Sequence, residues 1–188
     1  MQLDDYDIKC MSPAKRTHSR VIMKLSNILF SFLEKKGCRV YSDERPILIP
    51  KDILEKYKKL YGEKFKDQFP KKYFIPDLVV VCDKEIDREE FIEGSPTIVV
   101  EILSAKTFRI DMGYKKEMYK EMGVVEYWIV DPSHKFIEIF NFLINESIFL
   151  SIENVNEAEF NLEKEKPIKS FVFPDLEIFI SRLFDEDY

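Results

Sequence analysis

The chain has 188 residues, 45% of them hydrophobic and 34% charged, which excludes a disordered protein and allows one domain with a substantial core. No apolar run approaches the roughly 18 to 20 residues that span a bilayer, and the acidic N-terminus lacks the pattern of a secretory signal. We therefore expect a cytoplasmic protein with no membrane partner, whose residues 1–188 form a single domain.

The net charge of −6 is unevenly distributed along the chain. An acidic C-terminal segment, residues 152–188, contains ten acids and four bases and so accounts for all of it. Residues 51–72 hold eight lysines and four acids. A second basic cluster near the start consists of Lys15, Arg16, Arg20 and Lys24. Each cluster is either a solvated helix face or a surface for phosphate groups, so the overall acidity does not exclude a nucleic-acid ligand.

The cysteines and glycines exclude several kinds of site. Cys10, Cys38 and Cys82 are widely spaced and form no CxxC pair, which indicates buried reduced thiols and neither a disulfide framework nor a zinc site. The five glycines are isolated, so there is no glycine-rich phosphate loop, and neither GxSxG nor HExxH occurs. A serine or thiol nucleophile therefore has no support.

An amphipathic helix is predicted over residues 13–36. Ser12 and Pro13 have the pattern of a helix start, Gly37 has that of a stop, and apolar residues recur between them at helical spacing. His18 lies in the first turns of this helix. It is either a surface or hydrogen-bonded residue or, given the basic residues around it, a phosphate contact.

Short extended segments and a second helix follow. Residues 39–42 and 46–49 have the character of strands. Asp52 can cap a helix, which is expected to end before Pro70. Its lysines fall on the parts of the helix that do not carry its apolar residues.

Two apolar runs, predicted to be buried strands, each carry one carboxylate. Asp77 opens the run at 78–82, and Glu101 lies in the middle of the run at 97–103. An ionised carboxylate in a buried strand is costly unless a positive charge meets it. Side chains alternate along a strand, so the two carboxylates can face the same place if the strands are neighbours, and such a pair suits Mg²⁺. The structural alternative is a core ion pair.

A helix after Glu101 places a cation on an apolar stripe. Asp111 is predicted to cap this helix and Gly123 to end it. At about 100° per residue, one stripe carries Asp111, Met112, Lys115, Met118, Tyr119 and Met122. Lys115 lies at the centre of the stripe, whereas Lys116 points away. We therefore expect Lys115 to pair with the buried carboxylates.

The rest of the chain is predicted to be β-structure followed by a final helix. The expected elements are strands at 125–130, 136–142 and 148–152, a charged loop at 153–166 and a short helix that ends at Phe184. The turn Asp131-Pro-Ser-His134 joins the first two of these strands as a hairpin, with His134 exposed and without a role.

Four blocks of sequence follow one another in a recognisable order. They are IPDLVVVCD with Asp77, PTIVVEILSAKT with Glu101, the spacing of Asp111, Lys115 and Tyr119, and GVVEYWIVDP from Gly123. In order and spacing they resemble the Uma-type family of restriction endonucleases, a branch of the PD-(D/E)XK nuclease superfamily. The segment MSPAKRTH at residues 11–18 is similar to the opening of that family, so the resemblance spans most of residues 7–142.

The resemblance implies an α/β, restriction-endonuclease-like fold with a mixed central β-sheet flanked by helices. In that superfamily an aspartate and a glutamate on adjacent strands hold Mg²⁺, for which Mn²⁺ can substitute. These roles fall to Asp77 and Glu101, with the main-chain carbonyl of Ile102 as a further ligand. The usual lysine, two residues after the glutamate, is absent because Leu103 stands there. The Uma-type family shows the same departure, and its helical lysine corresponds to Lys115.

The resemblance also implies supporting positions and has two further departures. The supporting positions are His18, Asp111, Tyr119 and, as a candidate further metal ligand, Asp7. Lys106 stands where the family usually has serine, and residues 50–72 form a lysine-rich insertion.

The implied activity is hydrolysis of phosphodiester bonds. We expect a Mg²⁺-dependent endonuclease that cuts nucleic acid, in the first instance DNA, with Asp77, Glu101 and Lys115 as catalytic residues. The alternative is a catalytically inactive nuclease fold that binds nucleic acid or protein. A homodimer is compatible with either function.

Overall fold

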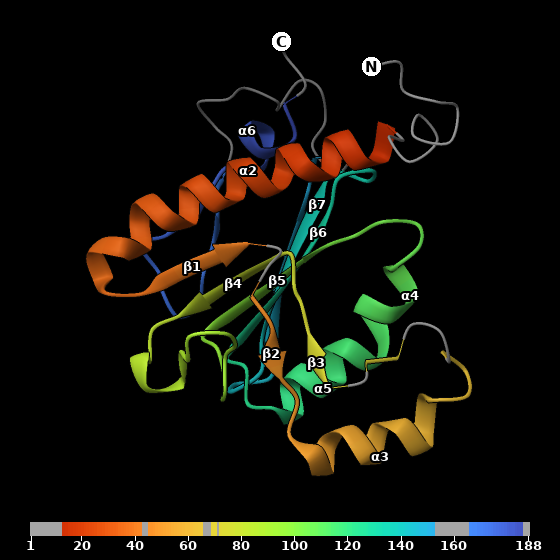
Figure 1. Ribbon diagram of the computed structural model, residues 1–188. Helices are drawn as coiled ribbons and strands as arrows, with labels where there is room; N and C mark the ends of the chain where they lie inside the picture. Colours follow the sequence, from red (N-terminus) through yellow and green to blue (C-terminus); the bar gives the residue numbers. More distant parts are fainter. Residues whose placement is uncertain (1–12, 43–44, 66–68, 71, 153–165, 186–188) are drawn as a thin grey trace, which may run out of the picture.

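The apolar runs beside Asp77 and Glu101 form the strands β4 (Leu78–Val81) and β5 (Ile98–Ile102), which are buried throughout. They are inner strands of a six-stranded sheet of order β1-β4-β5-β6-β7-β8 (Figure 1). Strands that are buried throughout need cover on both faces of the sheet. The expected α/β fold with a mixed central sheet flanked by helices is confirmed. The computed structural model describes residues 13–42, 45–65, 69–70, 72–152 and 166–185, to which all statements on structure refer.

The sheet is antiparallel except at its centre, where β5 runs parallel to β6. Its other strands are β1 (Arg39–Ser42), β6 (Glu126–Asp131), β7 (Phe136–Asn141) and β8 (Glu146–Ser151). Two small sheets pair β2 (Ile47–Leu48) with β3 (Tyr73–Phe74) and β9 (Ile168–Lys169) with β10 (Glu177–Ile178). The predicted strands are therefore confirmed, with ends that differ by one or two residues.

Helices cover both faces of the sheet. They are α2 (Pro13–Leu33), the 3-10 turn η1 (Glu34–Lys36), α3 (Lys51–Tyr61), the 3-10 turn η2 (Lys84–Ile86), α4 (Phe108–Ile110), the π-helical turn η3 (Asp111–Lys115), α5 (Lys116–Glu121) and α6 (Ile180–Phe184). Figure 1 shows α2 and α6 on one side of the sheet and α3, α4 and α5 on the other. Among the described residues, no helix has the length and apolar character needed to cross a membrane.

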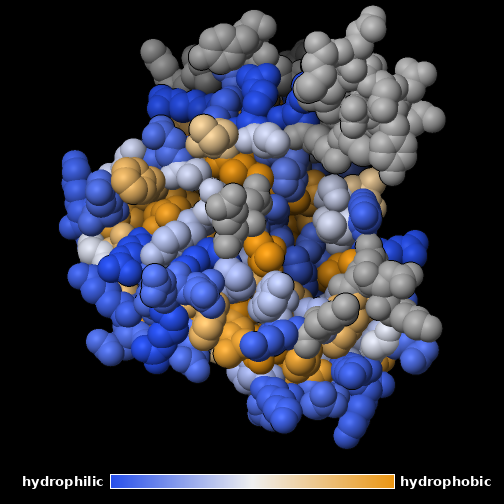
Figure 2. All heavy atoms as spheres, viewed as in Figure 1, coloured by the Kyte–Doolittle hydropathy of each residue, from blue (hydrophilic) through white to orange (hydrophobic). Residues whose placement is uncertain are grey.

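Alternation along the central strands supplies two hydrophobic cores. On one face, Leu25 of α2 belongs to the same core as Val100 and Trp128. On the other face, Met118 of α5 shares a core with Val99. Viewed as in Figure 1, apolar residues lie at the centre of the molecular surface and hydrophilic residues surround them (Figure 2). The two strands that flank the carboxylates thus serve both cores at once.

The first predicted helix, over residues 13–36, is confirmed as α2 and its extension η1. It ends at Gly37, whose φ of 79° lies in the left-handed region that glycine adopts without strain. The turn at this glycine leads directly into β1, so α2 lies along the sheet that follows it.

The second predicted helix is shorter than expected. α3 ends at Tyr61, well before Pro70. After the helix, the rings of Phe65 and Phe69 lie 5.0 and 5.2 Å from the ring of Tyr114 in η3. The chain after α3 therefore packs its aromatic side chains on η3.

The prediction that all three cysteines are reduced is wrong, because Cys38 and Cys82 form a disulfide. β1 pairs with β4 so that Arg39 lies opposite Val81, and the same register places the two cysteines opposite each other. They are 44 residues apart in the chain, so only the order of strands in the sheet brings them together. Cys10 lies outside the described residues.

A buried carboxylate attaches the C-terminal segment to the sheet. Glu126, at the start of β6, accepts hydrogen bonds from Trp128 Nε1 at 2.7 Å and from the Val172 N–H at 2.6 Å. The Ser170 hydroxyl donates a third, at 3.0 Å. Burial raises the pKa of Glu126, although these hydrogen bonds favour its charged form.

Glu126→Ala should lower the free energy of unfolding by about 2 to 4 kcal/mol, because it leaves these donors without their acceptor. Glu177→Ala removes only the exposed ion pair with Lys169 and should cost less than about 1 kcal/mol. Urea unfolding followed by tryptophan fluorescence measures both values. Equal losses would contradict the anchoring role of Glu126.

Candidate active site

Asp77 and Glu101 lie opposite each other at one end of the two central strands. β4 and β5 are antiparallel, with Leu78 opposite Val100, so Asp77, which precedes β4, lies at the end of β5 that carries Glu101, and its Oδ2 accepts the N–H of Ile102. Side chains alternate along a strand, so Glu101 and Val99 point to the same face of the sheet. That face is the one that Val99 shares with α5. The fold therefore brings the two predicted carboxylates to one place.

Glu101 is almost completely buried, with its side chain 5% exposed. Its Oε1 accepts a hydrogen bond from Lys115 Nζ at 2.7 Å and another from the Tyr119 hydroxyl at 3.1 Å. Burial raises the pKa of Glu101 to about 8, the Lys115 ammonium opposes this shift, and the carboxylates of Asp111 and Asp77 add to it. Both of those carboxylates thus act on Glu101 electrostatically.

Lys115 binds two carboxylates at once. Besides Glu101, its Nζ contacts Asp111 Oδ1 at 3.1 Å, and it lies 5.7 Å from the ring centroid of Phe74. Burial by itself lowers the pKa of Lys115, but the attraction of both carboxylates outweighs burial and raises it. With Asp77 included, the site contains three acidic side chains and one ammonium.

Lys116, the neighbouring lysine, points elsewhere. Its Nζ lies 3.4 Å from the ring centroid of Phe140 on β7. With Lys120 and Phe142 it lines a surface pocket of about 240 Å³ that does not include Glu101. The helical phase in the sequence therefore separates the two lysines correctly.

The helix that carries Lys115 begins earlier than predicted. It starts at Phe108, and Asp111 opens the π-helical turn, which has a kink at Gly113. Asp111 is buried, and its main-chain carbonyl accepts a hydrogen bond from the Tyr127 hydroxyl at 2.9 Å. The prediction that Asp111 caps the helix is wrong, because its carboxylate faces the ammonium of Lys115 and not the N–H groups of a helix start.

Asp77 is held by a main-chain group of β5 and by a side chain of α2. Its Oδ2 accepts the N–H of Ile102 at 2.6 Å, and its Oδ1 lies 3.2 Å from His18 Nε2 on α2. His18 precedes Ile22 by four residues and Leu25 by seven, so it continues the buried stripe of α2. This phase relation is a signal in the sequence that His18 lies on the side of α2 that faces the sheet.

The remaining predicted residues divide into three cases. Tyr119 is fully buried and contacts Glu101, as described above. Ile102 is buried and contributes its N–H to Asp77, while its carbonyl stays a predicted ligand. Asp7 lies outside the described residues.

The site offers a divalent cation two carboxylates and not a complete cage. Among the described residues, no three His, Cys, Asp or Glu side chains are grouped so that they could hold a metal ion. Mg²⁺ is commonly held by one or two carboxylates and completes its octahedral shell with water and phosphate oxygens. The two side chains of Asp77 and Glu101 fit that mode of binding, because they can supply one or two carboxylates.

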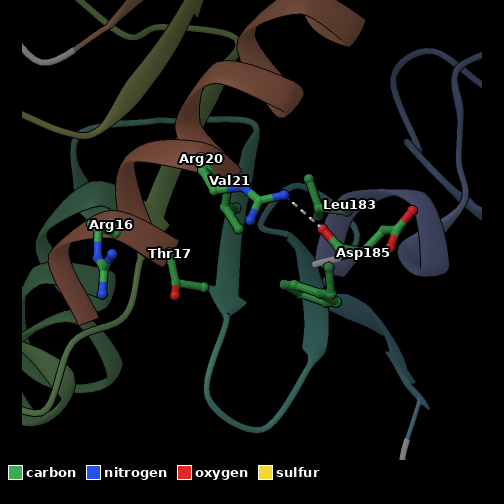
Figure 3. Close-up of a pocket in the computed structure, with 7 residues that line it drawn as sticks. Arg16, Thr17, Arg20, Val21, Leu183 and Asp185 are labelled. Atoms are coloured by element: carbon green, nitrogen blue, oxygen red, sulfur yellow. Dashed lines mark hydrogen bonds between the residues drawn. The ribbon is translucent and has the colours of Figure 1, made fainter. Parts of the chain in front are cut away.

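A separate pocket of about 390 Å³ lies beside the N-terminal half of α2 (Figure 3). Arg16 and Arg20 line it from α2, and Leu183 and Asp185 line it from the end of the chain. Arg20 donates a hydrogen bond to the main-chain carbonyl of Asp185 at 3.2 Å. His18 does not line this pocket, so Arg16 and Arg20 belong to a pocket that is distinct from the carboxylate site.

Comparisons with known proteins identify similar sequences and folds. The protein-family model described as "Uma2: Putative restriction endonuclease" matches residues 2–158. A crystal structure described as "a putative nuclease belonging to DUF820" from Anabaena variabilis has a TM-score of 0.62 and 15% sequence identity, and the match covers 89% of this chain and 80% of that chain. At this identity the likeness concerns the fold alone. No curated protein matches the chain.

The raised pKa of Glu101 makes the stability of the fold depend on pH. The pKa lies near 4.5 in the unfolded chain and near 8 in the folded protein, so between these values the folded state holds a proton that the unfolded state has lost. Raising the pH through this range therefore lowers the free energy of unfolding. For one proton the slope is at most about 1.4 kcal/mol per pH unit.

Glu101→Gln should abolish this contribution, because an amide does not titrate, and the variant should gain stability relative to the parent as the pH rises. Urea unfolding in EDTA between about pH 5 and pH 8 measures the difference. Glu93→Gln, in an exposed ion pair with Arg88, is the control. A Glu101→Gln difference that stays constant with pH would contradict the raised pKa.

Proposed function

Because the chain belongs to the Uma2 family, described as putative restriction endonucleases, we propose that it is a Mg²⁺-dependent endonuclease that hydrolyses phosphodiester bonds of DNA. The catalytic residues are Asp77, Glu101 and Lys115. The observation that carries the proposal is the contact of 2.7 Å between Lys115 and Glu101, close enough to Asp77 for its carboxylate to act on the pKa of Glu101.

Asp77 and Glu101 would hold Mg²⁺, with the carbonyl of Ile102 as a further ligand. When bound, the ion supplies positive charge to the phosphoryl oxygens and increases the acidity of a water molecule. Glu101 would hold the ion as a carboxylate, although burial raises its pKa to about 8 in the protein without metal. The N–H of Ile102 and the ring of His18 keep the carboxylate of Asp77 in a fixed orientation.

Lys115 stabilises the charge that develops on the phosphate, or orients the attacking water, from a position that excludes most solvent. Such an ammonium acts more strongly than one in bulk water, because the surrounding dielectric is lower. Asp111, as a second partner of the ammonium, helps to keep Lys115 charged and in place. Tyr119 donates to Glu101 and limits the movement of its side chain.

A binding module without catalysis is the second candidate. The observation that favours it is that Lys115 already forms ion pairs with both Glu101 and Asp111. A core ion pair of this kind can stabilise a fold without any reaction. This function requires nucleic-acid or protein binding that does not depend on a divalent ion.

Incubation with supercoiled DNA, linear DNA and RNA in Mg²⁺, Mn²⁺ or EDTA tests the proposal. A nuclease of this kind should cut DNA in Mg²⁺ or Mn²⁺ and leave it intact in EDTA. Binding without cleavage under all these conditions would support the second candidate. Cleavage that persists in EDTA would contradict both.

The choice of Lys115 over Lys116 can be tested by removing each charge in turn. Lys115→Met keeps the apolar stem and should lower turnover on the order of 10² to 10⁴, as when a positioned electrostatic donor is lost. Lys116→Met should weaken binding and its salt dependence, with much less effect on the chemical step. Single-turnover cleavage at saturating DNA measures the difference. Equal losses, or a larger one for Lys116→Met, would show that the wrong lysine has been assigned.

A further inference from the structure

The segment between β5 and η3 begins and ends at the candidate active site. Glu101 and Asp111 both contact Lys115 Nζ, at 2.7 and 3.1 Å. Residues 102–110 therefore form a connecting segment, called the loop below, and the residues that flank it both contact one ammonium group. A phosphate bound at Lys115 would lie beside this loop.

Two hydroxyl side chains give the loop a fixed shape. The hydroxyls of Ser104 and Thr107 are 3.0 Å apart, and each also accepts the main-chain N–H of the other residue at 3.3 Å. The N–H of Phe108 donates to the Ser104 carbonyl at 2.9 Å. This turn leads into α4, whose first residue is Phe108.

The turn presents one aromatic ring and two cations to solvent. Phe108 is 45% exposed, and Lys106 and Arg109 on either side of it are exposed as well. Phe108 precedes Asp111 by three residues of helix, a spacing at which Cβ atoms lie about 5 to 6 Å apart on one side of a helix. The backbone position of Phe108 is therefore one turn from that of Asp111, whose carboxylate contacts Lys115.

An exposed aromatic residue with a cationic residue on either side in the chain has the chemistry of a single-strand binding surface. Aromatic side chains stack on the faces of unpaired bases, and nearby cations neutralise the backbone phosphates. In a regular duplex the faces of a base are already covered by its neighbours, and reaching them requires unstacking. The position of Phe108 thus favours nucleic acid with at least one unpaired base.

We propose that Phe108, with Lys106 and Arg109, is a stacking platform for an unpaired nucleobase next to the scissile phosphodiester. The preferred substrate is then single-stranded nucleic acid, or the single-stranded part of a frayed or branched duplex. This inference rests on the proposed function for the position of the scissile bond. It assigns a role to Lys106, an exposed cation next to the turn.

Fluorescence anisotropy with a labelled oligonucleotide, as a single strand and as a blunt duplex, tests the platform in EDTA. Phe108→Leu should weaken binding of the single strand about 5- to 150-fold and leave duplex binding unchanged within error. Phe108→Tyr keeps the ring and should bind like the parent. Phe149→Leu is the matched control, because Phe149 is 51% exposed but lies on β8.

The cations are tested by the salt dependence of single-strand binding. Lys106→Gln and Arg109→Gln should each reduce the slope of log K against log salt by about 0.7. Lys35→Gln removes one exposed charge in η1, which follows the C-terminal end of α2, whereas His18 lies near the N-terminal end. This variant should leave the slope unchanged.

Two results would overturn the platform: no effect of Phe108→Leu on either ligand, or equal weakening for the single strand and the duplex. Failure of the nuclease proposal is visible separately. If no nucleic acid is cut in Mg²⁺ while single-strand binding depends on Phe108, the platform stands without the nuclease. If the parent and Phe108→Leu cut duplex and single strand equally well, the nuclease stands without the platform.

Discussion

The buried contact between Glu101 and Lys115 determines how the two halves of the candidate site meet. A carboxylate inside a strand of valine and isoleucine is costly without a positive partner, so the helix that follows β5 must bring one back to the strand. The π-helical turn does this with Asp111 as a second partner for the ammonium. Tyr119, one turn later, completes the hydrogen bonds of Glu101.

The surrounding structure supports this contact from several directions. The rings of Tyr61, Phe65 and Phe69 lie 5.9, 5.0 and 5.2 Å from the ring of Tyr114, which precedes Lys115 in the chain. The aromatic side chains of α3 and of the residues after it thus pack towards Tyr114, while the lysines of α3 are exposed. On the opposite face of the sheet, α2 brings His18 to Asp77. The site lies where elements from both cores reach the end of β4 and β5.

The sequence predicts most of this arrangement where the evidence is local. Helical phase separates Lys115 from Lys116, and alternation along two apolar runs predicts the strands that carry the carboxylates. It fails where the partner is distant in the chain. The disulfide between Cys38 and Cys82 follows from the pairing of β1 with β4, which no spacing reveals.

Asp111 and His18 show a second reason for failure. Asp111 matches the preferences of a helix start, yet the buried ammonium of Lys115 is a stronger partner than the N–H groups of a first turn. His18 has the phase of the buried stripe of α2, but the stripe alone does not say that a carboxylate lies beyond the end of the apolar core. For Asp111 a tertiary ion pair outweighs a local preference, and for His18 the local pattern does not identify the partner.

A Mn²⁺ titration, followed by the electron paramagnetic resonance signal of the free ion, tests the central claim most directly. Asp77→Asn should weaken Mn²⁺ binding at least about tenfold, because it removes one of the two carboxylates that hold the ion. Asp175→Asn is the matched control, since Asp175 also follows a proline but is exposed and distant in sequence from the site. Binding should be unchanged in this control. If Asp77→Asn binds Mn²⁺ as tightly as the parent does, the carboxylates do not form a metal site and the account is contradicted.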